Sequence, residues 1–181
     1  MPFMRKATDA PFGFIPHGPV LRMSPYRKLS GYGTAIYPGD IVIQLTAGDI
    51  NVGTTSSTTC VGVAATYSAA STADTVMVYD HPDQLFYVQD DSASTAMTSA
   101  SVGGNVNVTP TAGSTTTLRS LMELDSDTLN TTQALVMKVI GIHPVEGPYA
   151  TAFGTTTAQQ RRWVVQFNQH MLGQGVGKTG I

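Results

Sequence analysis

The stretch DTVMVYDHPDQLFYVQ, residues 74–89, decides the fold class of this chain. Two short runs rich in β-branched and aromatic residues, 74–79 and 84–89, flank the turn-forming sequence Asp-His-Pro-Asp at 80–83. In the first run apolar side chains alternate with other residues, as they do in a strand that buries one face. The stretch therefore predicts a β-hairpin, in a domain that is built from strands.

Similar short apolar runs continue on both sides of this hairpin. We expect further strands at 34–37, 41–45, 59–67, 106–108, 118–124, 135–142 and 163–167. Turn sequences such as Pro38-Gly39-Asp40 and Asp125-Ser126-Asp127 separate these runs. No amphipathic pattern is long enough for a 12-residue helix. The sequence therefore predicts an all-β fold, a compact β-barrel or β-sandwich with long Ser/Thr/Gly-rich loops.

Residues 1–32 differ in composition from the rest of the chain. They carry five prolines and three glycines, which oppose helix and favour extended backbone. We predict an extended N-terminal arm at 1–32, a β core at 33–172 and a flexible glycine-rich tail at 173–181. The arm also has apolar side chains that a solvated linker does not need, so we expect it to lie along a surface, either of its own domain or of a neighbouring subunit.

Aromatic and arginine side chains usually dominate the energy of a protein interface. The candidate interface residues of the arm are therefore Phe3, Phe12, Phe14, Arg22, Tyr26 and Arg27. The alternative is that the aromatic ones pack against the chain's own core.

Charged residues are scarce, at 12% of the chain against about 25% in typical soluble domains. The chain has 25 threonines and 13 serines, and a surface of hydroxyls suits contact with other subunits because few ions need desolvating. Residues 1–28 hold five basic side chains and one acidic one, whereas residues 40–127 hold ten acidic side chains and one base, Arg119. A net charge of −2 argues against nucleic-acid binding. The basic arm and acidic body of two copies could attract each other, or the uneven charge has no role.

The sequence contains little that resembles a catalytic or metal site. There is no Gly-x-Ser-x-Gly motif, and the four histidines are scattered. Cys60 lies in a strand-like run, which predicts a buried thiol without a disulfide. Aspartates near 80–91 and at 125–127 could bind a cation, although aspartate also favours turns for its local hydrogen bonds. We expect a non-enzymatic protein with no cofactor and no metal.

We also expect no membrane span, because no window approaches 18 apolar residues, and no signal peptide, because residues 1–16 lack an apolar core. The glycine-rich tail lacks the first glycine of a phosphate-binding loop, so we expect no nucleotide site there.

An ordered set of short motifs runs over most of the chain. It comprises Pro11-Phe12-Gly13-Phe14, Gly39-Asp40, Gly62-Val63, residues 76–88, Val102-Gly103-Gly104-Asn105, residues 122–126, residues 134–142, Trp163-Val164-Val165 and Asn168-Gln169-His170. With these motifs in this order, the chain resembles the head decoration, or capsid cement, proteins of tailed bacteriophages. It departs from them in a longer, proline-rich N-terminus that contains Tyr26-Arg27-Lys28.

The resemblance implies a non-enzymatic virion protein that binds the outer surface of an assembled capsid. Its partners would be the major capsid protein and copies of itself, in a symmetric homo-oligomer such as a trimer or dimer. The alternative is another virion β-module, a tail, spike or adhesin component that binds a host surface. An adhesin would expose Trp163 in a carbohydrate groove, whereas we expect Trp163 to be mostly buried.

Overall fold

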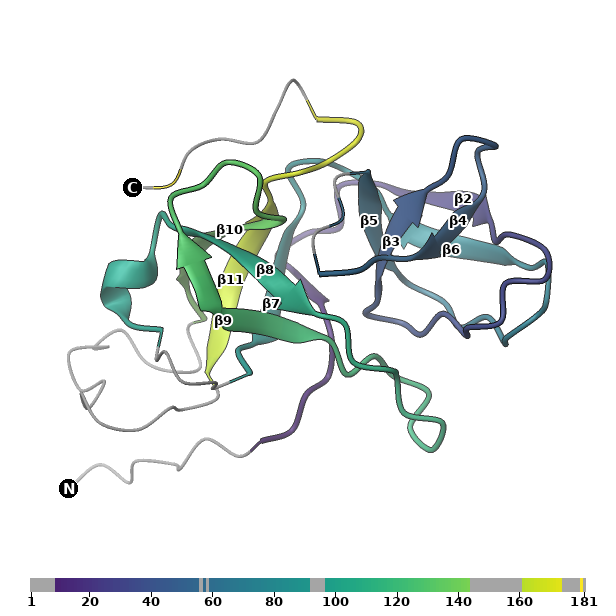
Figure 1. Cartoon of the computed structure of the whole chain (residues 1–181), viewed down its shortest axis with the longest axis horizontal. Coiled ribbons are helices and arrows are strands. Elements are labelled where there is room, and N and C mark those ends of the chain that lie inside the picture. The colour runs from purple at the N-terminus through teal and green to yellow at the C-terminus, as the bar shows by residue number, and fades with distance from the viewer. Residues whose placement is uncertain are drawn as a thin grey trace.

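The computed structural model describes residues 9–55, 57, 59–91, 97–143, 161–173 and 180. The regular elements in these residues are β-strands, apart from one turn of 3-10 helix at Ser99–Ser101. The strands form two antiparallel sheets, which lie side by side in Figure 1. The predicted all-β fold class is therefore confirmed. None of the helical structure in the described residues is long and apolar enough to cross a membrane.

The larger sheet has six strands in the order β1-β7-β11-β10-β8-β9. They are β1 (Ile15–His17), β7 (Leu85–Gln89), β11 (Arg162–Phe167), β10 (Met137–Ile142), β8 (Asn105–Thr109) and β9 (Glu123–Asn130). The Asp91 amide, just beyond β7, donates a hydrogen bond of 2.9 Å to the Leu124 carbonyl in β9. The sheet therefore curls round its own apolar interior.

The smaller sheet has five strands in the order β2-β6-β5-β3-β4. They are β2 (Met23–Arg27), β6 (Thr75–Tyr79), β5 (Cys60–Ala64), β3 (Ile41–Gln44) and β4 (Ile50–Val52). This sheet curls in the same way, because the Leu29 amide just beyond β2 donates to the Ile50 carbonyl in β4, at 3.2 Å.

Two apolar clusters fill the protein, and β5 stands between them. Cys60 and Val63 belong to the large cluster that the bigger sheet encloses, whereas Val61 and Ala64 belong to the small cluster inside the other sheet. Successive side chains of a strand point to opposite faces, and the register shift in the pairing of β5 with β3 allows residues three positions apart to share a face. With an apolar cluster on each side, every position of β5 is buried. The buried Cys60 and the fully buried Trp163 confirm two predictions from the sequence.

The two strands of the predicted hairpin at 74–89 both form, but they do not pair with each other. β6 pairs with β2 and β5, whereas β7 pairs with β1 and β11. The prediction of a hairpin was wrong, because each strand buries its apolar face in a different cluster: Val76 and Val78 of β6 in the small one, Phe86 and Val88 of β7 in the large one. The intervening residues 80–83 carry the chain from one sheet to the other.

The strand predicted at 118–124 was placed too early, and the turn predicted at Asp125-Ser126-Asp127 lies inside β9. Hydrogen bonds with neighbouring residues stabilise this polar sequence in an extended conformation. The Ser126 amide and hydroxyl both donate to the Asp91 carboxylate, at 3.1 and 2.8 Å, and the Asp125 carbonyl accepts from Thr128. Residues 34–37 contain no strand, only an isolated bridge between Ile36 and Ser68.

The described part of the predicted arm is extended, but it is built into the domain. β1 is an edge strand of the larger sheet and β2 an edge strand of the smaller one. Phe14, immediately before β1, is buried in the large cluster. The described residues of the arm therefore contribute one strand to each sheet.

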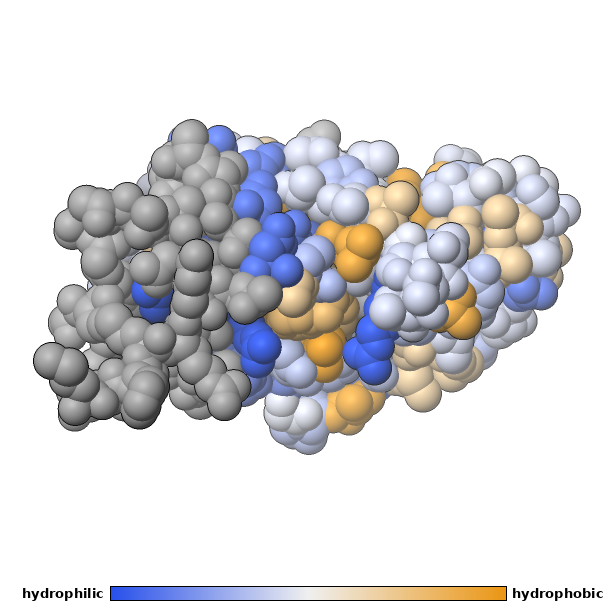
Figure 2. All heavy atoms as spheres, turned by 90° about the horizontal axis from the view of Figure 1, so that it is seen from below, coloured by the Kyte–Doolittle hydropathy of each residue, from blue (hydrophilic) through white to orange (hydrophobic). Residues whose placement is uncertain are grey.

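On the face shown in Figure 2, small apolar areas alternate with polar side chains. The exposed large apolar residues among the described ones are Val20, Leu21, Met23, Tyr67, Leu118, Ile140, Met171 and Leu172.

Candidate functional site

Two connections cross between the sheets next to each other. The segment between β1 and β2 joins the larger sheet to the smaller one, and the segment between β6 and β7 returns. Because β1 pairs with β7 and β2 pairs with β6, the two connections must run side by side. The side chain of Gln84 fastens them, since its Oε1 accepts a hydrogen bond of 2.9 Å from the Leu21 amide.

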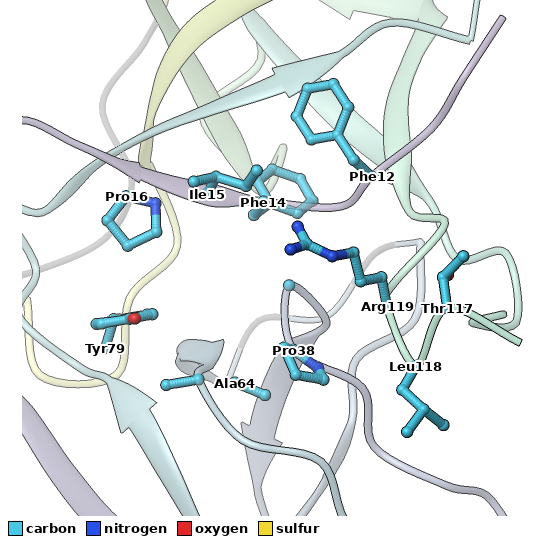
Figure 3. A pocket seen from close by; sticks show the side chains of 12 residues that line it. Phe12, Phe14, Ile15, Pro16, Pro38, Ala64, Tyr79, Thr117, Leu118 and Arg119 are labelled. Carbon is cyan, nitrogen blue, oxygen red and sulfur yellow. The ribbon is translucent and has the colours of Figure 1, made fainter. Parts of the chain in front are cut away.

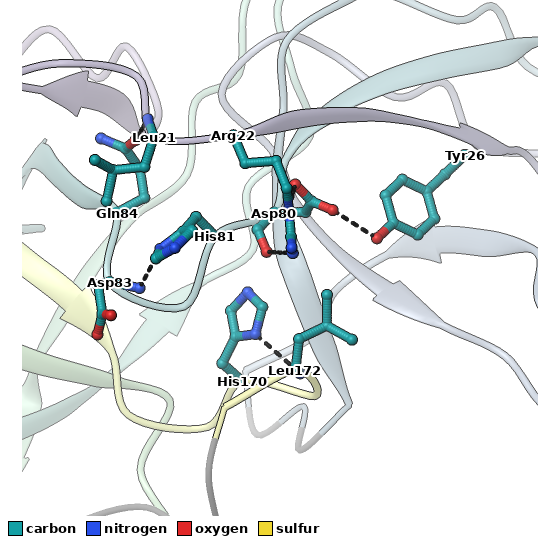
Figure 4. A network of polar contacts seen from close by, with 9 residues as sticks. All are labelled: Leu21, Arg22, Tyr26, Asp80, His81, Asp83, Gln84, His170 and Leu172. Atoms are coloured by element: carbon teal, nitrogen blue, oxygen red, sulfur yellow. Dashed lines mark hydrogen bonds and ion pairs between the residues drawn. The ribbon is translucent and has the colours of Figure 1, made fainter.

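An ion pair between Arg22 and Asp80 links the same two connections (Figure 4). The Arg22 guanidinium donates from Nε to Asp80 Oδ1 and from a terminal nitrogen to the Asp80 carbonyl, both at 2.9 Å. The Tyr26 hydroxyl donates to the other carboxylate oxygen, also at 2.9 Å. Two of the predicted interface residues, Arg22 and Tyr26, therefore meet at a buried carboxylate that the sequence had not connected with them.

The environment keeps Asp80 ionised. Burial alone would raise the pKa of its carboxyl group, but the hydrogen bonds from Arg22 and Tyr26 outweigh it and hold the pKa below its ordinary value. The pKa of Tyr26 is raised to about 12 by burial and by its bond to Asp80. Tyr26 thus remains a hydrogen-bond donor, and the network is charge-assisted.

The segment that follows β11 comes close to this network. The Met171 amide donates to the Cys60 carbonyl at 2.7 Å, and the Leu172 amide donates to His170 Nδ1 at 3.1 Å. Burial lowers the pKa of His170 to about 4, so the ring is neutral at physiological pH and can accept that bond.

Leu21 and Leu172 lie near the Arg22–Asp80–Tyr26 network in Figure 4, and Met171 precedes Leu172 in the chain. Each of these three side chains is between 46% and 49% exposed. We call these six residues the crossover surface. It combines an ordered arginine and tyrosine with exposed apolar side chains, a combination that is frequent at protein interfaces.

A pocket of about 390 Å³ lies where the two sheets meet (Figure 3). Phe12, Phe14 and Pro16, all from the predicted arm, form one wall, and Pro38, Ala64 and Tyr79 from the smaller sheet and its turns lie opposite. The Arg119 side chain extends into the middle of the pocket, between Phe14 and Pro38.

The six predicted interface residues of the arm do not form one surface. Arg22 and Tyr26 belong to the crossover surface, whereas Phe12 and Phe14 line the pocket. Phe12 also contacts Tyr87, with ring centroids 5.6 Å apart. Arg27, on β2, forms an ion pair with Asp49. Phe3 lies outside the described residues.

Three basic side chains in the described part of the arm bind oxygens of their own chain. Arg22 pairs with Asp80 and Arg27 with Asp49, while the Lys28 ammonium donates to the Ala69 carbonyl. The attraction between a basic arm and an acidic body, which we considered between two copies, therefore operates within one copy for these residues.

Two of the aspartates considered as cation ligands, Asp80 and Asp90, accept hydrogen bonds from protein groups. Asp80 binds Arg22, and the Asp90 carboxylate accepts hydrogen bonds from Trp163 Nε1 at 2.9 Å and from the Arg161 amide at 3.0 Å. Within the described ranges, no three His, Cys, Asp or Glu side chains are grouped as metal ligands would be.

The chain has no match among protein-family models, curated proteins or solved structures. Functional inference therefore depends on its own residues and their arrangement.

Proposed function

We propose that this chain is a non-enzymatic structural protein of a phage virion, which binds the outer surface of an assembled capsid and stabilises the joints between subunits of the major capsid protein. The observation that carries the proposal is the crossover surface. It presents Arg22 and Tyr26 in fixed positions, with exposed Leu and Met side chains nearby in space or in the chain.

Fixed anchors favour binding, because less side-chain entropy is lost on association. Immobilising a flexible side chain at an interface costs about 0.5–1.5 kcal/mol, and Asp80 already holds Arg22 in place. Methionine and leucine side chains around such an anchor adapt to a partner's shape and exclude water from it.

The scarcity of charge elsewhere also suits a subunit that covers other subunits. With only 12% charged residues, the chain can approach a neighbour while few ions lose their hydration. On a symmetric shell, a homo-oligomer engages several equivalent sites together, so modest affinity at each one gives stable decoration by effective concentration.

The alternative, a tail, spike or adhesin module, would use exposed aromatic rings to bind a host surface. Trp163, the single tryptophan, is fully buried and donates its indole N–H to Asp90. It cannot stack on a sugar without unfolding of the larger sheet, so we favour the capsid as the partner.

A pelleting assay tests the proposal. Purified protein is mixed with undecorated capsids of the phage that encodes it, and the copies bound per shell are counted after sedimentation. We expect saturation at a fixed number of copies per shell. Wild-type protein that stays in the supernatant at all concentrations would refute the proposed function.

Two matched variants test the role of the crossover surface. Leu172→Asp places a charge beside the network, whereas Ile140→Asp makes the same kind of change at an exposed position on β10 of the larger sheet. We expect Leu172→Asp to weaken capsid binding at least tenfold and Ile140→Asp to leave it nearly unchanged. Equal binding by both would show that the protein docks through another face.

A further inference from the structure

The pocket between the sheets has apolar walls and one charged side chain. Its lining includes the rings of Phe12 and Phe14, two prolines and Leu118, and the charge comes from Arg119. In Figure 3 the guanidinium lies among these apolar groups instead of turning away from them.

Arg119 differs from Arg22 and Arg27 because it has no acidic partner among the residues that the structure describes. Arg22 and Arg27 form ion pairs, but no described residue forms an ion pair or hydrogen bond with the Arg119 side chain. Arg119 is also the only basic residue between positions 40 and 127, where ten acids lie. The pocket is therefore a local cationic site in an otherwise acidic part of the chain.

The backbone beside Arg119 is held in an unusual conformation. Leu118 has a φ of +51°, in the left-handed region that bulky side chains rarely adopt. Leu118 ends the turn at 115–118, which an antiparallel bridge between Ser114 and Arg119 closes, and its side chain is exposed at the rim of the pocket. The Ser114 amide donates a hydrogen bond of 2.8 Å to the Arg119 carbonyl, so the turn fixes the main chain from which the Arg119 side chain extends.

We propose that this pocket binds an extended segment of a protein partner in which a carboxylate side chain stands next to an aliphatic or aromatic one. The carboxylate would pair with Arg119, and its apolar neighbour would lie between Pro16 and Ala64, on the opposite walls of the pocket. The identity of the partner as the major capsid protein rests on the proposed function; the chemistry of the segment rests on the pocket alone.

Charge complementarity selects this occupant. A guanidinium pairs with a planar carboxylate through two parallel hydrogen bonds, and apolar surroundings strengthen that pair. Thr117, Leu118 and Arg119 on one side of the pocket are exposed, so the site is open to solvent. An open site accepts side chains of a longer segment whose main chain continues across the surface.

Two blocked peptides test the pocket directly. The probes are N-acetyl-Ala-Asp-Leu-Ala-amide and the same peptide with Asn in place of Asp, titrated into 15N-labelled protein while amide chemical shifts are followed. We expect saturable shifts at Ala64, Leu118 and Arg119, with the Asn peptide about tenfold weaker, because a hydrogen bond to a charged partner is lost. Equal affinity for the two peptides, or shifts confined to other regions, would overturn the proposal.

An arginine variant and its control assign the effect. In Arg119→Gln the preference for the Asp peptide should disappear, whereas Arg27→Gln, with the same change in net charge on β2, should retain it. The spectrum of the variant without peptide reports whether it is folded. If Arg119→Gln still prefers the Asp peptide, the assignment of the carboxylate to this arginine is wrong.

The capsid assay separates this inference from the proposed function. If wild-type protein and Arg119→Gln bind capsids equally well, the pocket has no role in docking, whereas the proposed function stands. Peptide binding by a protein that never binds capsids would refute the proposed function and uphold the pocket.

Discussion

Replacing Asp40 by asparagine should stabilise the protein at neutral pH. Asp40 follows the Pro38-Gly39 turn, and its side chain is buried where it accepts a hydrogen bond of 2.8 Å from the Tyr37 amide. Burial raises the pKa of Asp40 to about 6, although Ser120 and the Tyr37 amide partly stabilise the charged form. An asparagine keeps the acceptor for the Tyr37 amide and has no charge to bury.

The sign of the effect follows from linkage. Because the folded protein binds the Asp40 proton more tightly than the unfolded chain does, this group's contribution to stability is complete below pH about 4. It is lost as the pH rises through about 6. The difference between 3.8 and about 6 corresponds to about 3 kcal/mol, at about 1.4 kcal/mol per pH unit. We expect Asp40→Asn to unfold with a free energy about 1–3 kcal/mol higher than wild type at pH 8, and with little difference at pH 4.

Urea unfolding followed by tryptophan fluorescence measures this difference. Trp163 is the single tryptophan and is fully buried, so its emission reports the loss of the large cluster. Asp83→Asn, at an exposed turn position, serves as the control and should show no comparable pH-dependent gain. If Asp40→Asn is less stable than wild type by the same amount at pH 8 and at pH 4, the ionised Asp40 carboxylate stabilises the fold. The reasoning above would then be wrong.

Two further substitutions test contacts between neighbouring strands, one in each sheet. Gly62→Ala should destabilise by about 3 kcal/mol or more, because the new Cβ would lie 2.0 Å from the Tyr79 carbonyl oxygen, whereas Gly33→Ala, with open space around it, should change stability by less than about 1 kcal/mol. A folded Gly62→Ala protein with unchanged urea midpoint would contradict the close approach of β5 and β6. Asp90→Ala should cost about 2–4 kcal/mol, since the indole N–H of Trp163 and the Arg161 amide lose their acceptor. Circular dichroism during thermal unfolding measures this loss, and a transition at the wild-type temperature would show that these donors find other acceptors.

The strands with clear apolar alternation could be predicted from the sequence, but their partners could not. Val76 and Val78 mark β6, and Phe86 and Val88 mark β7, so both were located within a residue or two. The turn between them has the residues of a hairpin. Whether it makes a hairpin or a crossing depends on which cluster each strand joins, and that is decided by β2 and β11, which lie far away in the sequence.

The candidate site could be predicted only in part for the same reason. Arg22 and Tyr26 were selected by residue type, but their partner Asp80 lies 58 positions after Arg22. No local pattern connects the two. Arg119 was noticed only as a lone base among acids, since its place in a pocket depends on how the segment before β1 packs between the sheets.

The edge of β2 indicates how a partner can approach the crossover surface. Pro25 lies at the centre of this edge strand, opposite Met77 of β6. On the side of β5, the Met77 amide donates a hydrogen bond to the Thr66 hydroxyl, and the Met77 carbonyl accepts one from the Ala65 amide. The Pro25 nitrogen therefore faces outward, and it carries no hydrogen to donate.

A strand added to this edge would meet a missing donor at its midpoint, which is a common protection against edge-to-edge association. Main-chain pairing along β2 is thus disfavoured, even though the edge is next to Arg22 and Met23. A partner at the crossover surface has to be recognised by side chains. For that reason we expect substitutions such as Leu172→Asp, which leave every backbone hydrogen bond intact, to be sufficient to abolish docking there.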